Sequence, residues 1–224
     1  MKPLLLIMNP RRIPECLDAI RALKIDKVWL TAMWERELEA PIAKLVEERD
    51  DYTHFVIISD DTIPTQDALD LVLAAAEQTD VAAGYCNLDA IRPYVSLCAS
   101  PFDPALGSVH EAYDWITRED VEGSGPIGSL MEVFHQGFAF TCMPRAMWQR
   151  FPFKVFGEHP RGFASDYVLS LRLQQADVPI HAVRGAFMPH LKPDITRYDR
   201  TPGHELLMGA IPAAVQWDLA GRRP

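Results

Sequence analysis

Hydrophobic residues in the first half of the chain follow two alternating patterns. Short apolar runs of strand length occupy residues 3–8, 26–30, 54–58 and 81–85. The segments between them carry apolar residues at helical spacing, over residues 13–23, 34–48 and 66–77. Strands that alternate with helices in this way predict a mostly parallel sheet covered by helices on both faces.

The second half has a less regular pattern of shorter elements. It predicts strands over residues 91–98, 130–142, 179–183 and 185–190 and helices over residues 144–150 and 165–175. Residues 100–128 are rich in Pro, Gly, Asp and Glu, which is typical of loops with a short helix. We therefore expect one α/β domain over residues 1–190. Residues 191–224 hold many prolines and charges and are expected to form a C-terminal tail or lid.

Composition narrows the class of protein. The chain has 224 residues, of which 48% are hydrophobic, enough for one sizeable core. Its formal net charge of −9 argues against a general binder of phosphate backbones. No apolar stretch reaches transmembrane length, and residues 1–8 are too short for a signal peptide, so we expect a cytoplasmic protein without a membrane anchor. The four scattered cysteines suit buried thiols in a reducing compartment.

The main chemical signal follows the strand predicted over residues 54–58. This apolar run ends in Ser59, Asp60 and Asp61, just before the helix predicted over residues 66–77. Two carboxylates at the end of a buried strand are costly, and a cation with oxygen ligands would remove that cost. Ligands also bind at such strand ends in open α/β sheets. The sequence therefore predicts a metal-assisted site for a phosphorylated ligand, with a cluster of acids at a helix start as the alternative.

Four separated segments together resemble glycosyltransferases of the GT-A fold, closest to the family 2 type. They are the strand end at residues 59–64, the glycine-containing strand at 135–141, the acid-headed helix at 163–172 and the strand end at His190. The resemblance covers most of residues 1–190. It implies metal-dependent transfer of a sugar from a nucleotide-sugar donor, with a UDP-sugar favoured, to an acceptor hydroxyl, and inversion is the favoured outcome.

The resemblance assigns roles to individual residues. Asp61 matches the metal-binding acid of the family's D-x-D motif, and Asp60 would contact the donor ribose or the metal. Ser59 stands where the first Asp of that motif often is. His190 would complete the shell of Mn²⁺ or Mg²⁺, since imidazole with carboxylate oxygens suits manganese best. A structural or surface histidine is the alternative.

Two further positions concern the transferred sugar and the acceptor. Gly137 would let the backbone approach the donor sugar closely, unless it is a β-bulge glycine. Asp166 would take the proton from the acceptor hydroxyl, with an ordinary helix N-terminal acid as the alternative. Ser165 replaces the first acid of the pair that the family places here.

The loop after the first strand is the predicted site of the nucleotide. Asn9, Arg11 and Arg12 would bind the donor there, with the arginines facing phosphates, and solvated charges at a helix start are the alternative. Residues 31–35 are a second candidate for the base, and Asn87 and Asp89 are weaker candidates for the donor or acceptor cleft. A basic group around and beyond His190 consists of Arg184, Lys192, Arg197 and Arg200. It is expected to be a charged, solvated tail, with closure over the diphosphate as the functional alternative.

Other functions stay open at this point. A nucleotidyltransferase would carry glycine in the loop at residues 9–12, which has none, and an Asp-nucleophile phosphohydrolase needs D-x-D-x-T spacing, which residues 59–62 lack. A non-catalytic sugar-nucleotide-binding or scaffold protein is plausible because Ser59 and Ser165 replace acids. The acceptor could be a glycan precursor, a protein or a modified DNA base. DNA would need a basic strip, for which the candidates are Arg145, Arg150, Lys154, Arg161, Lys192, Arg197 and Arg200.

Overall fold

The computed structural model describes residues 1–8, 13–88, 93–103, 105–106, 113–155 and 165–191. The helices are α1 (Pro14–Ala22), the 3₁₀ helix η1 (Glu35–Leu38), α2 (Glu39–Glu48), α3 (Gln66–Ala75), α4 (Arg118–Gly123), α5 (Arg145–Arg150) and α6 (Ser165–Gln175). The strands are β1 (Pro3–Met8), β2 (Lys27–Leu30), β3 (His54–Ser59), β4 (Ala82–Cys86), β5 (Tyr94–Cys98), β6 (Trp115–Thr117), β7 (Leu130–Val133), β8 (His135–Gln136), β9 (Ala139–Pro144) and β10 (Ile180–Met188).

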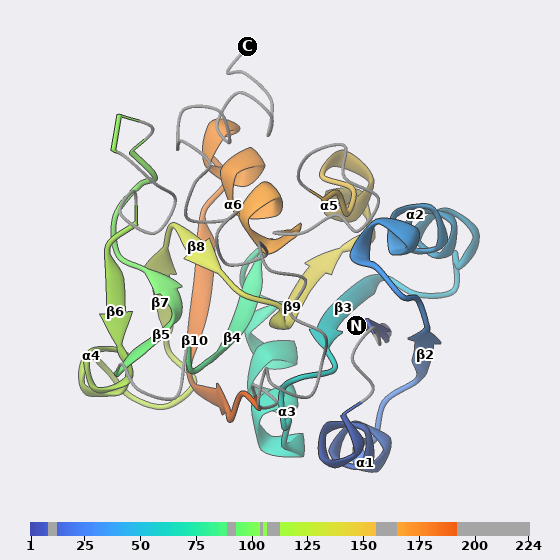
Figure 1. Ribbon diagram of the computed structural model, residues 1–224, viewed down its shortest axis with the longest axis horizontal. Helices are drawn as coiled ribbons and strands as arrows, with labels where there is room; N and C mark the ends of the chain where they lie inside the picture. Colours follow the sequence, from blue (N-terminus) through green and yellow to red (C-terminus); the bar gives the residue numbers. More distant parts are fainter. Residues whose placement is uncertain (9–12, 89–92, 104, 107–112, 156–164, 192–224) are drawn as a thin grey trace.

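Among the residues that the structure describes, seven strands form the central sheet, in the order β2-β1-β3-β9-β4-β10-β7. Five of them run in one direction, whereas β9 and β7 are antiparallel to their neighbours. A second, antiparallel sheet has the order β6-β5-β8 and lies with α4 at the opposite side of the molecule from β2 (Figure 1). The predicted mostly parallel sheet is therefore confirmed.

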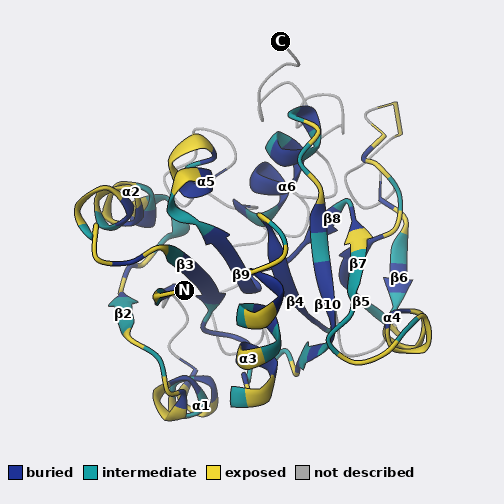
Figure 2. Cartoon of the chain, turned by 180° about the vertical axis from the view of Figure 1, so that it is seen from behind, coloured by how far each residue is buried: buried dark blue, intermediate teal, exposed yellow. Residues whose placement is uncertain are grey.

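Helices cover both faces of the central sheet, as predicted. Alternate residues of β1 enter different cores, because successive side chains of a strand point to opposite faces. Leu4 and Leu6 pack with α2, α5 and α6, whereas Leu5 and Ile7 pack with α1 and α3. Figure 2 shows the strands in the middle of the sheet mostly buried and the helices exposed on their outer sides. The indole N–H of Trp148 in α5 also donates to the carbonyl of Phe55, at 2.9 Å.

Two elements differ from the prediction for physical reasons. The single helix expected over residues 34–48 is divided into η1 and α2. Pro41 lies in the first turn of α2, where its missing N–H costs nothing, whereas a helix from Trp34 would have placed it inside. The strand region at residues 130–142 holds three strands, and a bulge at Phe140 (φ 58°) shifts the register of β9 against β3. The bulge is therefore at Phe140 and not at Gly137.

One edge of the central sheet gathers the ends of several strands. Met8 of β1 pairs with Ser59 of β3, and Cys86 of β4 pairs with Met188 of β10, so four parallel strands end together. The antiparallel strand β9 begins at the same edge, with Ala139 beside Ile58. This carboxyl edge is where an open α/β sheet binds ligands, and it carries most of the predicted site residues.

Candidate functional site

The segments that follow β3 and β10 pair with each other at the carboxyl edge. They form an isolated antiparallel bridge between Thr62 and His190. The backbone N–H of Leu191 donates to the carbonyl of Asp61, at 2.7 Å. This pairing brings together Asp61 and His190, which are 129 positions apart in the sequence.

The side chains of Asp61 and His190 are directly hydrogen-bonded. The Nε2 of His190 lies 2.9 Å from Oδ2 of Asp61, and its Nδ1 lies 2.9 Å from the carbonyl oxygen of Asn87. Only 11% of the Asp61 side chain and 15% of the His190 side chain are exposed. Burial lowers the pKa of His190, but its hydrogen bonds with Asp61 and Cys86 outweigh burial and raise the pKa to about 10. With Nδ1 donating to the carbonyl of Asn87, Nε2 is the nitrogen that would bind a cation in place of its proton.

The geometry of this pair fits two ligands of one divalent cation. Two ligand atoms that lie at right angles around an octahedral ion, each about 2.1 Å from it, are about 3 Å apart. Oδ2 of Asp61 and Nε2 of His190 have that separation, and one oxygen with one imidazole nitrogen suits Mn²⁺. The described part of the chain has no group of three or more His, Cys, Asp or Glu side chains that could hold an ion. A cation here would therefore take its other ligands from phosphate oxygens and water.

Asp60 lies between the ends of β1 and β3. Its backbone N–H donates to the carbonyl of Met8 at 3.0 Å, and the residue is fully buried. The donor loop predicted after Met8, with Asn9, Arg11 and Arg12, falls outside the described residues, as does Asp89. Donor binding by Asp60 and by this loop stays a prediction.

Gly137 lies between the small sheet and the start of α6. Its backbone N–H donates to the carbonyl of Ser96 in β5, at 3.0 Å. A Cβ atom on Gly137 would lie 3.0 Å from Cβ of Ser96 and 3.9 Å from Oδ2 of Asp166. The other carboxylate oxygen of Asp166, Oδ1, accepts the backbone N–H of Tyr167 at 2.9 Å. Asp166 thus turns one oxygen to its own helix and the other toward Gly137.

An aromatic cluster supports the first turn of α6 beside Asp166. The Tyr167 ring lies 4.5 Å from the His135 ring and 5.6 Å from the Tyr113 ring, measured between centroids. Burial raises the pKa of both tyrosines far above the ordinary value, so they stay neutral. This packing ties the position of Asp166 to the small sheet.

A continuous series of contacts connects Asp166 with the Asp61–His190 pair. Gly137 bonds to Ser96, whose Oγ accepts the backbone N–H of Cys86 at 3.2 Å. The Cys86 side chain in turn hydrogen-bonds with His190. The series therefore runs through Asp166, Gly137, Ser96, Cys86, His190 and Asp61.

Ser165, which replaces an acid of the family's pair, has an acidic partner from elsewhere in the chain. Its hydroxyl donates to Oε2 of Glu35, at 2.8 Å. Ser165 is buried, and Glu35 belongs to η1, within the segment at residues 31–35 that was expected to bind the base. A carboxylate therefore lies at the start of α6 although the local sequence has none before Asp166.

Two expectations about basic residues were wrong. Arg184 is buried, and its guanidinium donates to Val121, Ser124, Ser129 and Leu130, so it holds loops together and is not part of a basic lid. Arg145 donates to the carbonyl of Tyr52 at 2.9 Å, at the amino end of β3 and the opposite edge from Asp61.

The remaining basic candidates do not assemble a strip that the structure describes. Lys154 forms an ion pair with Glu39 of α2, at 2.9 Å. The guanidinium of Arg150 lies over the ring of Phe151. Arg161, Lys192, Arg197 and Arg200 fall outside the described residues, as does the predicted tail from residue 192 onward.

Sequence reasoning missed the residues that connect the two halves of the site. Cys86 had been interpreted only as one of four buried thiols, and all four are buried and outside any disulfide. Ser96 and Glu35 carried no signal of their own, because their roles depend on which strands and turns are neighbours. Cys86 could have been found from its place at the carboxyl end of β4, the same edge as Asp61 and next to Asn87, which the sequence did offer as a candidate.

Comparison with solved structures places the fold. The structure of A197 from STIV matches with a TM-score of 0.57 and 17% identity, over 86% of this chain and 87% of that chain. The structure of S. aureus TarS 1-349 matches with a TM-score of 0.47 and 11% identity, over 96% of this chain and 68% of that chain. No family model and no curated protein matches the sequence. The fold is GT-A-like, as the sequence predicted.

The lengths and sequences of the helices show whether any of them could cross a membrane. Within the residues that the structure describes, no helix combines the length and the apolar character needed to cross a bilayer.

Proposed function

We propose that the protein is a metal-dependent glycosyltransferase that moves a sugar from a nucleotide-sugar donor to an acceptor hydroxyl. The observation that carries this proposal is the convergence of Asp61 and His190, 2.9 Å apart, at the carboxyl edge of a GT-A-like sheet. Asp166 and Gly137 lie at the same edge and connect with that pair through Ser96 and Cys86.

In the proposed reaction each residue has a defined task. Asp61 and His190 hold Mn²⁺ or Mg²⁺, and this cation supplies positive charge that stabilises the nucleoside diphosphate as it leaves. Asp166 takes the proton of the acceptor hydroxyl as the acceptor oxygen bonds to the anomeric carbon and the bond to phosphate breaks. One base is enough for a direct displacement, so inversion is the favoured stereochemistry.

Gly137 has a task that depends on its missing side chain. It lies within 4 Å of Oδ2 of Asp166, counted from where a Cβ atom would be. A side chain at this position would push against Ser96 next to the proposed base, which is the reason to keep glycine there. UDP-sugars are the first donors to test.

The proposal is tested by donor binding and donor hydrolysis in Asp61→Ala. A panel of nucleoside diphosphates and nucleotide sugars is measured by thermal shift with and without Mn²⁺, followed by hydrolysis of any donor that binds. We expect a Tm rise that needs both nucleotide and Mn²⁺ and is lost in Asp61→Ala. Hydrolysis should fall by at least roughly 100-fold, because a catalytic cation supplies several kcal/mol of charge stabilisation.

Asp80→Ala is the matched control, since Asp80 is an exposed acid just before β4, at the opposite edge of the sheet. It should bind and hydrolyse the donor like the unmodified protein. Equal Tm rises in Asp61→Ala and the unmodified protein would refute the metal site. Mn²⁺-dependent binding without hydrolysis or transfer would instead favour the non-catalytic alternative, which rests on Ser59 and Ser165.

A further inference from the structure

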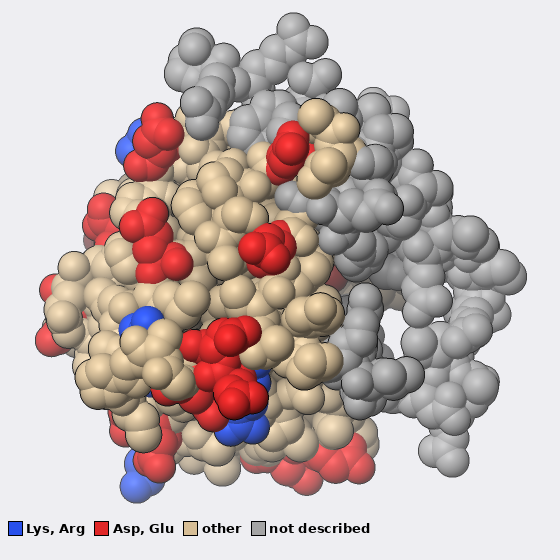
Figure 3. Space-filling view, turned by 90° about the vertical axis from the view of Figure 1, so that its left-hand side faces the viewer, with Lys and Arg blue, Asp and Glu red and all other residues tan. Residues whose placement is uncertain are grey.

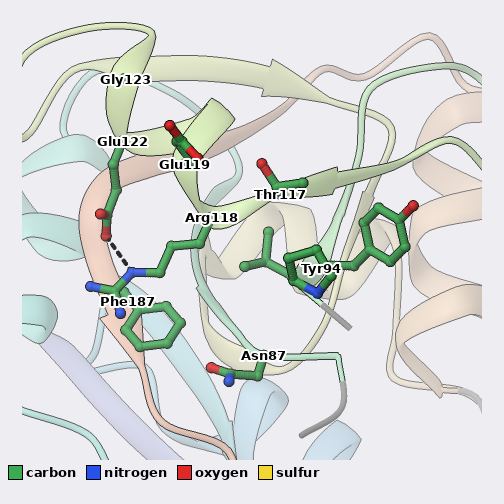
Figure 4. Close-up of a pocket in the computed structure, with 10 residues that line it drawn as sticks. Asn87, Tyr94, Thr117, Arg118, Glu119, Glu122, Gly123 and Phe187 are labelled. Carbon is green, nitrogen blue, oxygen red and sulfur yellow. Dashed lines mark hydrogen bonds and ion pairs between the residues drawn. The ribbon is translucent and has the colours of Figure 1, made fainter. Parts of the chain in front are cut away.

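A pocket of about 640 Å³ opens beside the candidate metal site. The end of β4, the start of β5, the junction of β6 with α4, and β10 all line it. Asn87 connects the pocket with the site: it lines the pocket (Figure 4), while its carbonyl oxygen lies 2.9 Å from Nδ1 of His190. Only Asn87 therefore separates a molecule in this pocket from His190, a proposed metal ligand.

The pocket presents an aromatic face, a guanidinium and carboxylates. The guanidinium carbon of Arg118 lies 3.8 Å from the ring centroid of Phe187, and Nε of Arg118 donates to Oε1 of Glu122 at 2.7 Å. Figure 4 shows Arg118 between that ring and that carboxylate, with Asn87 projecting from the other side. The planar side chains are thus oriented before a ligand arrives.

These groups suit a polyhydroxyl ligand. Guanidinium and carboxylate groups each offer two polar atoms in one plane, which can bond to neighbouring hydroxyls of a sugar ring. The half-buried ring of Phe187 lies under the Arg118 guanidinium, and this cation–π contact holds the guanidinium in the pocket lining. A mainly apolar concave surface with a few placed polar groups is the usual form of a small-molecule site.

The charge of the pocket selects among such ligands. Arg118 is its single cation, whereas Glu119 and Glu122 are two anions, so the described lining is net negative. Figure 3 views the molecule from the side of β6 and α4, and acidic side chains predominate over basic ones on that face. A phosphate or uronic acid group would meet like charge here, which disfavours DNA and acidic glycans.

We propose that this pocket is the acceptor subsite and binds an uncharged sugar residue of a glycan. Arg118, Glu122 and Asn87 bond to the hydroxyls of that sugar, while the ring of Phe187 holds the Arg118 guanidinium in place. The role as acceptor subsite rests on the proposed transferase function, but glycan binding can be measured without donor or metal.

The test is binding of the full-length protein to an array of uncharged and uronic-acid-containing oligosaccharides, with a DNA duplex as a separate probe. We expect binding to uncharged oligosaccharides, weakened roughly tenfold in Phe187→Leu, which keeps an apolar side chain but loses the ring. Trp29→Leu is the matched control: Trp29 is a half-buried ring in β2 that also lies under an arginine, Arg21, at 5.8 Å. It should bind glycans like the unmodified protein.

A second variant is expected to gain binding, a result that loss of folding could not cause. Glu119→Lys reverses the net charge of the pocket lining, and it should add binding to uronic-acid oligosaccharides that the unmodified protein rejects. A misfolded variant could not produce that gain. Binding only to DNA or acidic glycans, or to no oligosaccharide on the array, would overturn the inference.

Donor hydrolysis and glycan binding test the proposed function and the acceptor subsite separately. Phe187→Leu should keep Asp61-dependent hydrolysis of the donor and lose only glycan binding and transfer to the glycan. If it loses donor hydrolysis in parallel, Phe187 belongs to the donor site and the acceptor subsite is wrong, while the transferase proposal stands. If the Asp61 test fails but glycan binding depends on Phe187, the pocket is a glycan site in a protein with another function.

Discussion

Gly137→Ala should lower both stability and activity, because the added methyl group has no room. Its Cβ would lie 3.0 Å from Cβ and 3.2 Å from Oγ of Ser96, tighter than ordinary van der Waals contact. The backbone of Gly137 is outside the left-handed region, so the cost is steric and not conformational. Ser96 is the residue that must move.

The size of the effect follows from what holds Ser96. Its carbonyl accepts the N–H of Gly137 at 3.0 Å and its Oγ accepts the N–H of Cys86 at 3.2 Å, so a shift of a few tenths of an ångström disturbs both contacts. Overpacking of this kind costs about 1–3 kcal/mol of unfolding free energy. Activity should fall further, since Asp166 lies on the other side of the new methyl group and reacting groups tolerate little displacement.

Urea unfolding and donor hydrolysis measure the two effects. Gly123→Ala is the control, because a Cβ there would meet nothing within 4 Å, and it should leave stability unchanged or slightly raised. Ser96→Gly removes the atoms in the way, so the double variant with Gly137→Ala should be more stable than the two single costs predict, by about 1 kcal/mol. Additive costs would refute the contact with Ser96 as the cause.

Two further substitutions test how the elements around the site are held. Gly84→Ala should prevent stable folding, since its Cβ would lie 2.5 Å from the backbone oxygen of Ala139, which cannot move without distorting β9; recovery of folded protein with unchanged urea midpoint would contradict this packing. Thr65→Ala should lower the unfolding free energy by about 1 kcal/mol, because Oγ1 of Thr65 accepts the N–H of Ala68 at the start of α3. Thr65→Ser should retain the cap, and equal losses in both variants would exclude the hydrogen bond as the cause.

Elements with strong periodicity could be predicted from the sequence, and short ones could not. β1 and β3 are continuous apolar runs because both of their faces are buried, and α3 carries a regular apolar stripe. In contrast, β6 and β8 have three and two residues, and they form only because β5 lies between them. Such strands depend on long-range pairing that no local pattern records.

Some residues of the candidate site could likewise be predicted from the sequence, and others could not. Asp61 and His190 could be expected at one edge because each follows a predicted strand, and parallel strands end together. The part played by Ser96 and Cys86 depends on the register between neighbouring strands, which a sequence pattern leaves open. Arg184 was misjudged for a similar reason: a basic residue near the edge is buried by loops that only the fold brings to it.

The two serines that replace acids do not weigh equally against catalysis. The carbonyl of Ser59 accepts the hydroxyl of Thr62 at 3.0 Å, and its N–H donates to Phe138, so the Ser59 backbone shapes the turn that presents Asp61. The hydroxyl of Ser165 instead donates to Glu35 at 2.8 Å, and so a carboxylate is supplied to the start of α6 by a distant segment. Glu35 therefore places a carboxylate beside Ser165, where the family has an acid in the sequence itself. For this reason Ser165 is weaker support for a non-catalytic protein than the sequence suggests.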